Sequence, residues 1–268
     1  MKNKVNNDTC EYYFRELEEI KEKCTFFINK MNDEINERII TPRISLRFSQ
    51  YLAFEKNKKV LFVLSDLNSL TDSIRSIYCI QKMKSEDIFR NEFSSLFEMG
   101  GSIKEKEGSV TIISISLLPN DDMNHPIPDM SGYLSESIIY IDRRLSQIQI
   151  FPPIDISYCY SFLFHKFVGE NKTRKEHFHL SNQIVNLYST SKQTLMNSFI
   201  TGTTEDDDLL FLNFRENFEN SFIHQNTDFR TIEESLDILW KLISIFPKNN
   251  ITLIPPKILE QFYSYKLK

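Results

Sequence analysis

The sequence predicts an α/β domain with a mostly parallel sheet, followed by an all-helical domain. Two continuous apolar runs rich in β-branched residues, 59–67 (KVLFVLSDL) and 109–118 (SVTIISISLL), are typical of parallel strands that are buried on both faces. A helical pattern separates the two runs, and strands that alternate with helices indicate a parallel sheet. From residue 158 onward the sequence shows no convincing strand pattern, and apolar residues recur at helical spacing.

The first part of the chain is expected to alternate between helices and strands. In TPRISLRFSQYLAFE, Thr41 is a helix-capping residue and Pro42 occupies the favoured first helical position, so we expect a helix to begin there. Apolar and polar residues alternate in ESIIYIDRRL, which predicts a third strand. The predicted elements are, in order, a polar helix at 11–25, a strand at 26–29, a helix at 41–55, a strand at 59–67, a helix at 70–83, and strands at 109–118 and 136–145.

The second part of the chain begins after FPPIDIS (151–157), where the pattern changes to successive helices. Acidic residues in the first turn of TEDDDLLFLNFRENF favour a helix there, because they complement the helix dipole. The predicted helices are 158–169, 173–200, 206–224, 230–246 and 256–265. We therefore expect three parts: a polar helical segment at 1–25, a partial α/β domain at 26–157 and a helical bundle at 158–268.

Composition and charge exclude several classes of function. The net charge is −5 and the basic residues are scattered among acids, which argues against a nucleic-acid-binding protein. The sequence contains no apolar run of the roughly 18 residues that a membrane-spanning helix needs. The N-terminus is polar and lacks the apolar stretch of a signal peptide. The cysteines lack metal-ligand spacing, which favours buried, inert thiols in the cytosol: Cys10, Cys24, Cys79 and Cys159.

Glycine is scarce, and this bears on phosphate binding. The chain has six glycines, and none stands in the spacing of a phosphate loop or of a dinucleotide-binding turn. A backbone that surrounds phosphate normally needs glycine so that several amides can converge. The sequence therefore contains no recognisable phosphate loop.

Candidate chemical groups gather after the two apolar strands. Asp66 ends the first strand, where an acid in a nucleotide-binding α/β fold meets a metal ion or water at the carboxyl edge of the sheet. The run LLPNDDMNHPIPDMSGY follows the second strand. Its Asp121, Asp122, His125 and Asp129 fit either a metal or acid–base set or, as we favour, a turn in which Asp and Asn cap the backbone and Pro stiffens it.

Two histidines, His177 and His179, stand two residues apart in KEHFHL. On a helix their side chains would point about 200° apart, which argues against a shared metal ion. The order of residues assembles no Ser/His/Asp or Cys/His catalytic set.

The run PNDDMNHPIPDMSGYLSESIIYIDRRL (119–145) resembles the B subunit of the vacuolar-type proton ATPase. The resemblance extends upstream through ERIITPRISL and VLFVLSDLNS. Downstream it continues through PPIDIS, GENKTRKEH, SNQIVNLY, FENSFIHQ, TIEESLDILWKLISIFPK and PPKILEQFY. The motifs keep their order and spacing from about Tyr12 to Tyr263.

This resemblance implies a fold, a role and partners. The family's B subunit has an N-terminal β-barrel, a RecA-like nucleotide-binding domain and a C-terminal helical bundle. It alternates with the catalytic A subunit in the cytosolic head of an endomembrane proton pump. The B subunit is non-catalytic and supplies an arginine that stabilises phosphoryl transfer at the A/B interface. ATP or ADP at that interface is the candidate ligand, no cofactor is otherwise assigned, and membrane association is expected only through the complex.

The sequence departs from the family pattern in three places. The β-barrel and the first half of the nucleotide-binding domain, with its phosphate loop, have no counterpart. The Gly- and Arg-rich interface loop is missing from the stretch 79–109. The arginine position falls on Phe162, and Lys166, one helical turn on, lacks the planar fork of arginine.

These departures predict no ATP hydrolysis by the chain alone and leave other roles open. The chain could be a non-catalytic B-type subunit, or a truncated B-like paralogue that acts in assembly or regulation. It could also be an incomplete gene product without function. The function that the sequence favours least is that of an independent nucleoside triphosphatase. The candidate interface residues are Asp66, Asp121, Asp122 and Phe162.

Overall fold

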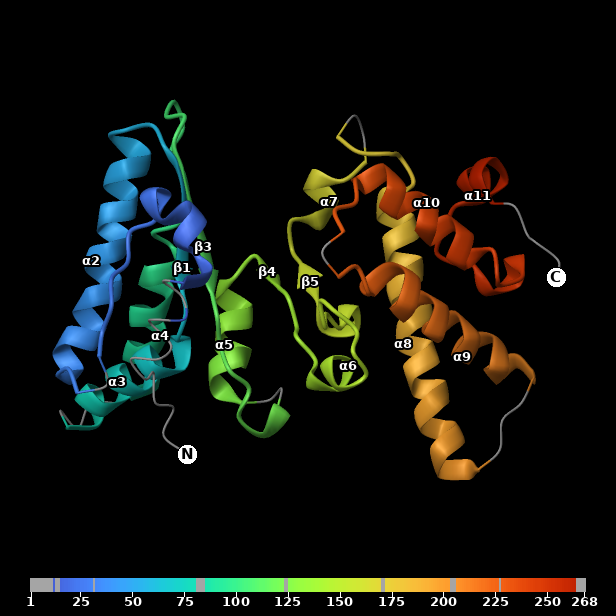
Figure 1. Cartoon of the computed structure of the whole chain (residues 1–268), viewed down its shortest axis with the longest axis horizontal. Coiled ribbons are helices and arrows are strands. Elements are labelled where there is room, and N and C mark those ends of the chain that lie inside the picture. Colours follow the sequence, from blue (N-terminus) through green and yellow to red (C-terminus); the bar gives the residue numbers. More distant parts are fainter. Residues whose placement is uncertain are drawn as a thin grey trace. The chain divides into compact units, whose positions relative to one another are not determined.

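The computed structural model of the chain divides into two compact units, which meet in sequence between Ser135 and Glu136 (Figure 1). Each unit has its own core of buried apolar side chains. The structure describes residues 12, 15–30, 32–80, 85–122, 125–169, 172–202, 206–226 and 228–263. Within these ranges it describes every side chain except those of 78–80, 85–89, 128, 129, 206 and 207.

The first unit is built on a three-stranded sheet with the order β1-β3-β2. β1 (Lys59–Leu64) and β3 (Ser109–Ser114) are parallel, with Lys59 opposite Ser109 and Leu64 opposite Ser114. β2 (Gly101–Ser102) pairs with β3 in the antiparallel direction. The other elements of this unit are η1 (Glu18–Lys23), α2 (Ile35–Phe54), α3 (Leu67–Ile80), α4 (Ser85–Phe97), η2 (Pro119–Asp121) and α5 (Pro126–Leu134).

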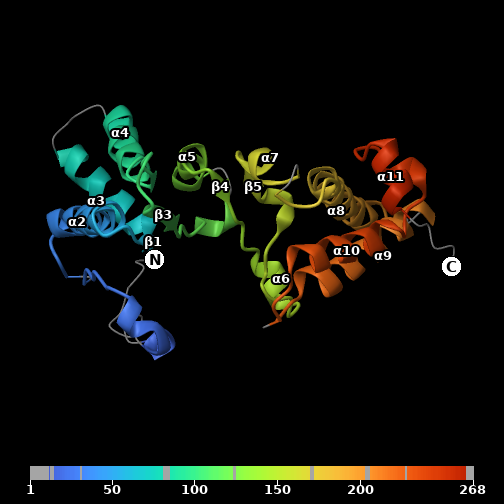
Figure 2. The ribbon, with the colours of Figure 1, turned by 90° about the horizontal axis from the view of Figure 1, so that it is seen from above.

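Only one face of the β1–β3 pair is covered by the described helices. Alternate strand residues such as Val60, Phe62 and Val110 pack against the buried side chains of α2, α3, α4 and α5 (Figure 2). The opposite face remains open, although its side chains are apolar and parallel sheets are usually buried on both faces. The exposed fractions on this open face are 60% for Leu61, 51% for Val63, 48% for Ile113 and 43% for Ile115.

The structure confirms the two strands and corrects other predictions in the first unit. The runs 59–67 and 109–118 form the parallel pair, in shorter strands than predicted. No strand forms at 26–29. In the described part of 11–25, Tyr12, Arg15 and Glu16 are α-helical and the 3₁₀ helix η1 follows, so this part of the predicted helix is confirmed in its helical character but not as one continuous α-helix. α2 begins at Ile35, so Pro42 lies inside the helix and not at its first position.

The second unit contains a helical bundle preceded by short irregular elements. Its longest helix, α8 (His177–Thr201), packs against α9 (Asp206–Phe218) and α10 (Ile232–Ile243) (Figure 1). Aromatic side chains of the core meet near Phe214, whose ring lies 5.1 Å from that of Phe246. The remaining elements are β4 (Ser137–Ile138), α6 (Arg143–Gln147), η3 (Ile156–Tyr158), β5 (Tyr160–Ser161), α7 (Phe164–Phe167), η4 (Glu219–Ile223, a π-helix), η5 (Lys248–Asn250) and α11 (Pro256–Phe262).

Two predictions for this part of the chain are wrong. The segment 136–145 is not a strand of the parallel sheet. Its strand β4 pairs antiparallel with β5, and an isolated antiparallel bridge joins Ile141 to Ile154. The buried Asp142 ends the extended segment, since its Oδ1 accepts a hydrogen bond from the Arg144 amide at 2.8 Å and caps α6. The segment 158–169 is also not one helix. It contains the last residue of η3, then the short strand β5 and the short helix α7.

The four later helices are confirmed as α8, α9 with η4, α10 and α11. The molecule therefore has an α/β unit with a mainly parallel sheet and a helical unit, as the sequence predicts. In the part of the chain that the structure describes, no helix combines the length and apolar character needed to cross a membrane.

Candidate functional site

The carboxyl ends of β1 and β3 lie at one edge of the sheet, and polar side chains tie them together. Asp66 follows β1, and its Oδ1 accepts a hydrogen bond from the Ser69 amide at 2.9 Å, which caps α3. Asn68 bonds the main chain beyond β3, because its Oδ1 accepts from the Leu117 amide at 2.9 Å and its Nδ2 donates to the Leu117 carbonyl at 3.0 Å. Asp66 is therefore a capping residue at the edge where nucleotides bind in α/β folds.

The turn after β3 places Asp121 and Asp122 at the surface. Asn120 and Asp121 both adopt left-handed backbone conformations, with φ of 58° and 57°, which Asn and Asp tolerate better than most residues. Both residues are exposed, and each has at least one interaction partner. His125 caps α5, because its Nδ1 accepts a hydrogen bond from the Ile127 amide at 3.4 Å.

This geometry agrees with a turn and does not assemble a metal site. Among the described residues, no three His, Cys, Asp or Glu side chains lie close enough to hold a metal ion. The side chain of Asp129, the fourth member of the predicted set, lies outside the described residues.

Phe162 belongs to the second unit and directly follows β5. Its side chain is 58% exposed, and its ring meets the Tyr160 ring edge-on at 5.1 Å. Its amide donates a hydrogen bond to the Glu136 carbonyl at 2.9 Å, which extends the β4–β5 pairing. Lys166 lies in α7 and is also exposed. Position 162 therefore presents an exposed phenyl ring, and a phenyl ring has no N–H to donate to a phosphate.

His177 and His179 have separate roles at the start of α8. The Nδ1 of His177 lies 3.0 Å from the Thr173 hydroxyl, and burial lowers the pKa of this imidazole. The ring of His179 instead packs edge-on against Phe178.

Cys159 is half-buried within a hydrogen-bonded turn. Its thiol donates to the Asp155 carbonyl and accepts from the Tyr140 amide, each at 3.2 Å, and burial raises its pKa. This setting disfavours the reactive thiolate. Cys24 is likewise half-buried, whereas Cys10 and the side chain of Cys79 lie outside the described residues.

A buried charged network in the second unit was not predicted from the sequence. The carboxylate of Asp155 is fully buried and forms an ion pair with Lys192 of α8. Nearby, the Tyr188 hydroxyl donates to the Glu219 carboxylate at 2.9 Å. Burial is the main cause of a raised pKa at both Tyr188 and Glu219. Sequence patterns missed this network because its members are far apart in the chain.

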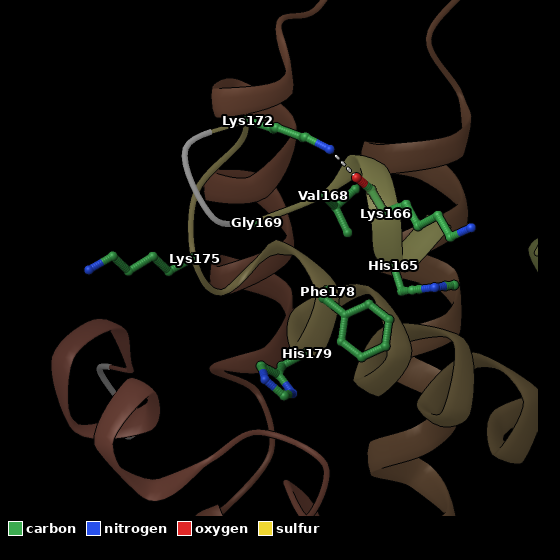
Figure 3. Close-up of a pocket in the computed structure, with 8 residues that line it drawn as sticks. All are labelled: His165, Lys166, Val168, Gly169, Lys172, Lys175, Phe178 and His179. Carbon is green, nitrogen blue, oxygen red and sulfur yellow. Dashed lines mark hydrogen bonds between the residues drawn. The ribbon is translucent and has the colours of Figure 1, made fainter. Parts of the chain in front are cut away.

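A second unpredicted feature is a basic pocket of about 580 Å³ next to α7 and the start of α8 (Figure 3). In the sequence, most of its lining belongs to the run HKFVGENKTRKEH (165–177), in which basic residues stand among acids. The described residues that line the pocket are His165, Lys166, Val168, Gly169, Lys172, Lys175, Phe178 and His179.

Comparisons with known families place the chain in one class. Residues 4–161 match the model of the ATP synthase alpha/beta family, nucleotide-binding domain, and residues 166–263 match the C-terminal domain of V and A type ATP synthase. The chain therefore belongs to the ATP synthase alpha/beta family. This confirms the predicted order of a nucleotide-binding domain followed by a helical domain. The two family models meet between residues 161 and 166, whereas the two compact units of the structure meet after Ser135. The domain boundaries expected from the sequence, at residues 25 and 157, remain predictions.

Within this family, the chain is similar to V-type B subunits, which confirms the resemblance found in its motifs. It is 38% identical over 269 residues to each of two V-type proton ATPase B subunits of Acetabularia acetabulum, numbered 2 and 1. The match includes 97% of this chain and 55% of each relative, so the chain spans about half their length.

Solved structures support the same fold. The ATP synthase subunit NeqB from Nanoarcheaum equitans superposes with a TM-score of 0.75 and 27% identity, covering 90% of this chain and 62% of NeqB. The type III secretion ATPase EscN from enteropathogenic E. coli has a TM-score of 0.69 and 21% identity, covering 85% of this chain and 57% of EscN. At that identity, the second likeness concerns the fold alone.

Proposed function

We propose that the chain is a non-catalytic B-type subunit of the soluble head of a vacuolar-type proton-pumping ATPase. Its role would be structural and regulatory in ATP-driven proton transport, without ATP hydrolysis of its own. The observation that carries this proposal is the similarity of 97% of the chain to V-type B subunits. The two family models follow one another along the chain in the matching order, which supports the same conclusion.

The proposal that the chain is non-catalytic rests on two observations. The 268 residues contain no glycine spacing of a phosphate loop. Phe162, to which the motif resemblance assigns the family's arginine position, presents an exposed phenyl ring. That arginine stabilises negative charge in the transition state of phosphoryl transfer, and a phenyl ring can neither carry a charge nor donate hydrogen bonds. A ring assembled with this chain would not turn over at the interface that Phe162 faces.

The same proposal specifies partners, ligand and location. The partners would be the catalytic A subunits and the other subunits of the head, on the cytosolic face of vacuolar or other endomembranes. ATP or ADP would bind at the subunit interface near Asp66, Asp121 and Asp122, which lie at the carboxyl edge of the sheet. The chain would reach the membrane only through the complex.

The experiment that tests this function restores the missing guanidinium. The chain is co-expressed with the catalytic A subunit of its pump, and ATP hydrolysis by the purified assembly is compared between the wild type and Phe162→Arg. An arginine finger increases the rate of phosphoryl transfer by a factor of roughly 10³–10⁵. We expect Phe162→Arg to increase the rate of ATP hydrolysis by the assembly at least about ten-fold over the wild type. Phe167→Arg is the matched control, because Phe167 is another exposed phenylalanine, in α7, and this variant should leave hydrolysis unchanged.

Two results would contradict this proposal. ATP hydrolysis by the purified chain without an A subunit would show that the chain is itself catalytic. Equal activation by both arginine variants would show that position 162 has no special relation to the transferred phosphate.

A second function, that of an assembly or regulatory factor, is favoured by the open apolar face of the β1–β3 pair. Contiguous exposed apolar side chains such as Leu61, Val63 and Ile113 are typical of protein-binding surfaces. A factor that acts transiently would be present in fewer copies than the catalytic subunit, whereas a ring subunit would be present in equal number. The copy number in the purified pump separates the two functions.

A further inference from the structure

We propose that the basic pocket of the second unit binds a ligand through a multiply charged phosphate group. The pocket lies entirely between residues 165 and 179, so binding there requires neither an ATPase assembly nor the proposed role of Phe162. This inference is therefore independent of the proposed function.

The charge of the pocket points to an anion. Its described lining contains three lysines and two histidines and no acidic side chain, although the whole chain has a net charge of −5. A concave surface lined by one sign of charge concentrates ligands of the opposite sign. The described basic lining residues are His165, Lys166, Lys172, Lys175 and His179.

Two described acids next to the pocket are engaged elsewhere. Arg174 forms ion pairs with both Glu176 and Asp237, which occupies the two carboxylates. By contrast, Lys166 and Lys175 form no ion pair with any described residue. Among the described residues, the ammonium groups of Lys166 and Lys175 therefore remain available to an external anion.

The lysines reach the pocket from different parts of its rim. In Figure 3, Lys166 and Lys175 extend on opposite sides, while Lys172 points toward Lys166. The ammonium of Lys172 donates a hydrogen bond to the Lys166 carbonyl and lies 5.3 Å from the centre of the Phe167 ring. Lys166 and Lys175 are exposed, so rotation about their side-chain bonds on the picosecond to nanosecond timescale can bring both ammonium groups over a bound ligand.

The floor of the pocket is suited to hold a compact anion. The half-buried Val168 and Phe178 exclude water from one side, and a drier surrounding strengthens charge–charge attraction. Gly169 is buried with φ of +75°, a conformation that lets the chain turn sharply between α7 and the loop before α8. The first turn of the 25-residue α8 also lines the pocket and adds the positive end of its dipole.

The chemistry favours phosphate over a carboxylate. Lysine acts as a compact point charge with three donors and does not provide the planar fork that matches a carboxylate. Three lysines around a volume of about 580 Å³ suit a ligand with two or more phosphate charges and room for an attached group. Pyrophosphate is the simplest probe of this chemistry, and the headgroup of a phosphoinositide carries the same groups.

The test is calorimetric titration of pyrophosphate into the full chain and into the double variant Lys166→Gln/Lys175→Gln. The double variant loses two charge-assisted hydrogen bonds to the ligand, so it should weaken binding by at least about one hundred-fold. The matched control is Lys241→Gln/Lys257→Gln, which removes the same charge from exposed lysines of α10 and α11 in the same unit. The control should bind like the wild type. Absence of binding to the wild type, or equal weakening in both double variants, would overturn the proposal.

A second arm identifies the source of the phosphate. The chain is mixed with phosphatidylcholine vesicles that contain or lack a phosphoinositide, and the bound fraction is measured by sedimentation. If a lipid headgroup is the ligand, only phosphoinositide vesicles bind, pyrophosphate competes, and Lys166→Gln/Lys175→Gln abolishes binding. If a free phosphate compound is the ligand, pyrophosphate binds in the calorimeter and neither vesicle does. Vesicle binding that the double variant retains would count against the pocket.

Discussion

The buried ion pair of Asp155 and Lys192 should be a main determinant of the stability of the second unit. Asp155 is 0% exposed, and the Lys192 side chain is 24% exposed. Asp155→Asn keeps the Oδ1 atom that accepts from the Ser157 amide at 3.0 Å, so the cap of η3 survives. The substitution removes only the negative charge that Lys192 faces.

The expected cost follows from that geometry. Removal of one partner from a buried ion pair costs roughly 3–5 kcal/mol, because the other charge remains buried without compensation. The Lys192 ammonium lies 5.2 Å from the Tyr158 ring and 5.6 Å from the Tyr188 ring and keeps these contacts in the variant. It also retains partial access to water. We therefore expect a loss at the lower end of the range, about 3 kcal/mol.

Urea unfolding followed by tryptophan fluorescence measures this loss in the correct unit. Trp240 is the only tryptophan in the chain and is buried in the core of the second unit, so its emission reports the unfolding of that unit. A typical urea dependence of about 2 kcal/mol per molar converts the loss into a midpoint lower by roughly 1.5 M. The matched control is Asp237→Asn, whose carboxylate pairs with Arg174 but is 61% exposed, and which should cost less than about 1 kcal/mol.

A double-mutant cycle provides the decisive comparison. Lys192→Met removes the cation and keeps an apolar stem, and the combination with Asp155→Asn removes both charges. The coupling energy of the pair should be about 3 kcal/mol. A coupling energy below about 0.5 kcal/mol would refute the reasoning, because the two charges would then contribute independently.

Three further substitutions test other parts of the structure. Gly108→Ala should destabilise the first unit by about 2 kcal/mol or more, since the added Cβ would lie 1.8 Å from the Ala53 carbonyl oxygen. Calorimetry should then show one unfolding transition at a lower temperature. The urea midpoint that Trp240 reports for the second unit should stay unchanged. Asn68→Ala should lower the stability of the first unit by about 1–3 kcal/mol, because it removes the hydrogen bonds that hold the main chain beyond β3. Amide hydrogen exchange at Leu117 should become faster in this variant. Unchanged protection of the Leu117 amide would contradict this role of Asn68. Burial raises the pKa of Glu219, so its contribution to stability is full below the ordinary carboxyl pKa and is lost as pH rises through the raised value. Glu219→Gln should remove this pH dependence of the free energy of unfolding. The stability of the variant relative to the wild type should therefore increase with pH by about 1.4 kcal/mol per unit of pKa shift. A stability difference between variant and wild type that does not change with pH would contradict the assignment.

The features that sequence predicted well are those that local pattern determines. The apolar run at 59–64 is a strand, and the structure pairs it in parallel with 109–114. The predicted burial of both faces is wrong, since Leu61 and Val63 are 60% and 51% exposed. Helix α10 of the second unit combines apolar spacing with a clear cap at Thr231, whose side chain and Glu234 form a capping box. Such signals depend on neighbours within a few residues and can therefore be read from the chain alone.

The features that sequence missed depend on distant partners. Alternation at 136–145 predicted a strand, but pairing with β5 extends over only two residues before Asp142 caps a helix. Pro42 can start a helix, yet the same residue lies inside α2, because the helix begins seven residues earlier at Ile35. In the candidate site, the position of Asp66 at a strand end was predicted, whereas its bond to Ser69 became visible only in the structure. The ion pair of Arg174 with Asp237, next to the basic pocket, joins residues 63 positions apart and therefore could not be predicted from the sequence.

The copy number of this chain in the purified pump tests the central claim most directly. A tagged form of the chain is expressed in its own cell, the proton pump is isolated through the tag, and native mass spectrometry counts the subunits. A B-type ring subunit predicts equal numbers of this chain and the catalytic A subunit in one stable head. A pump head that excludes this chain, or carries it in fewer copies than the A subunit, would contradict the account.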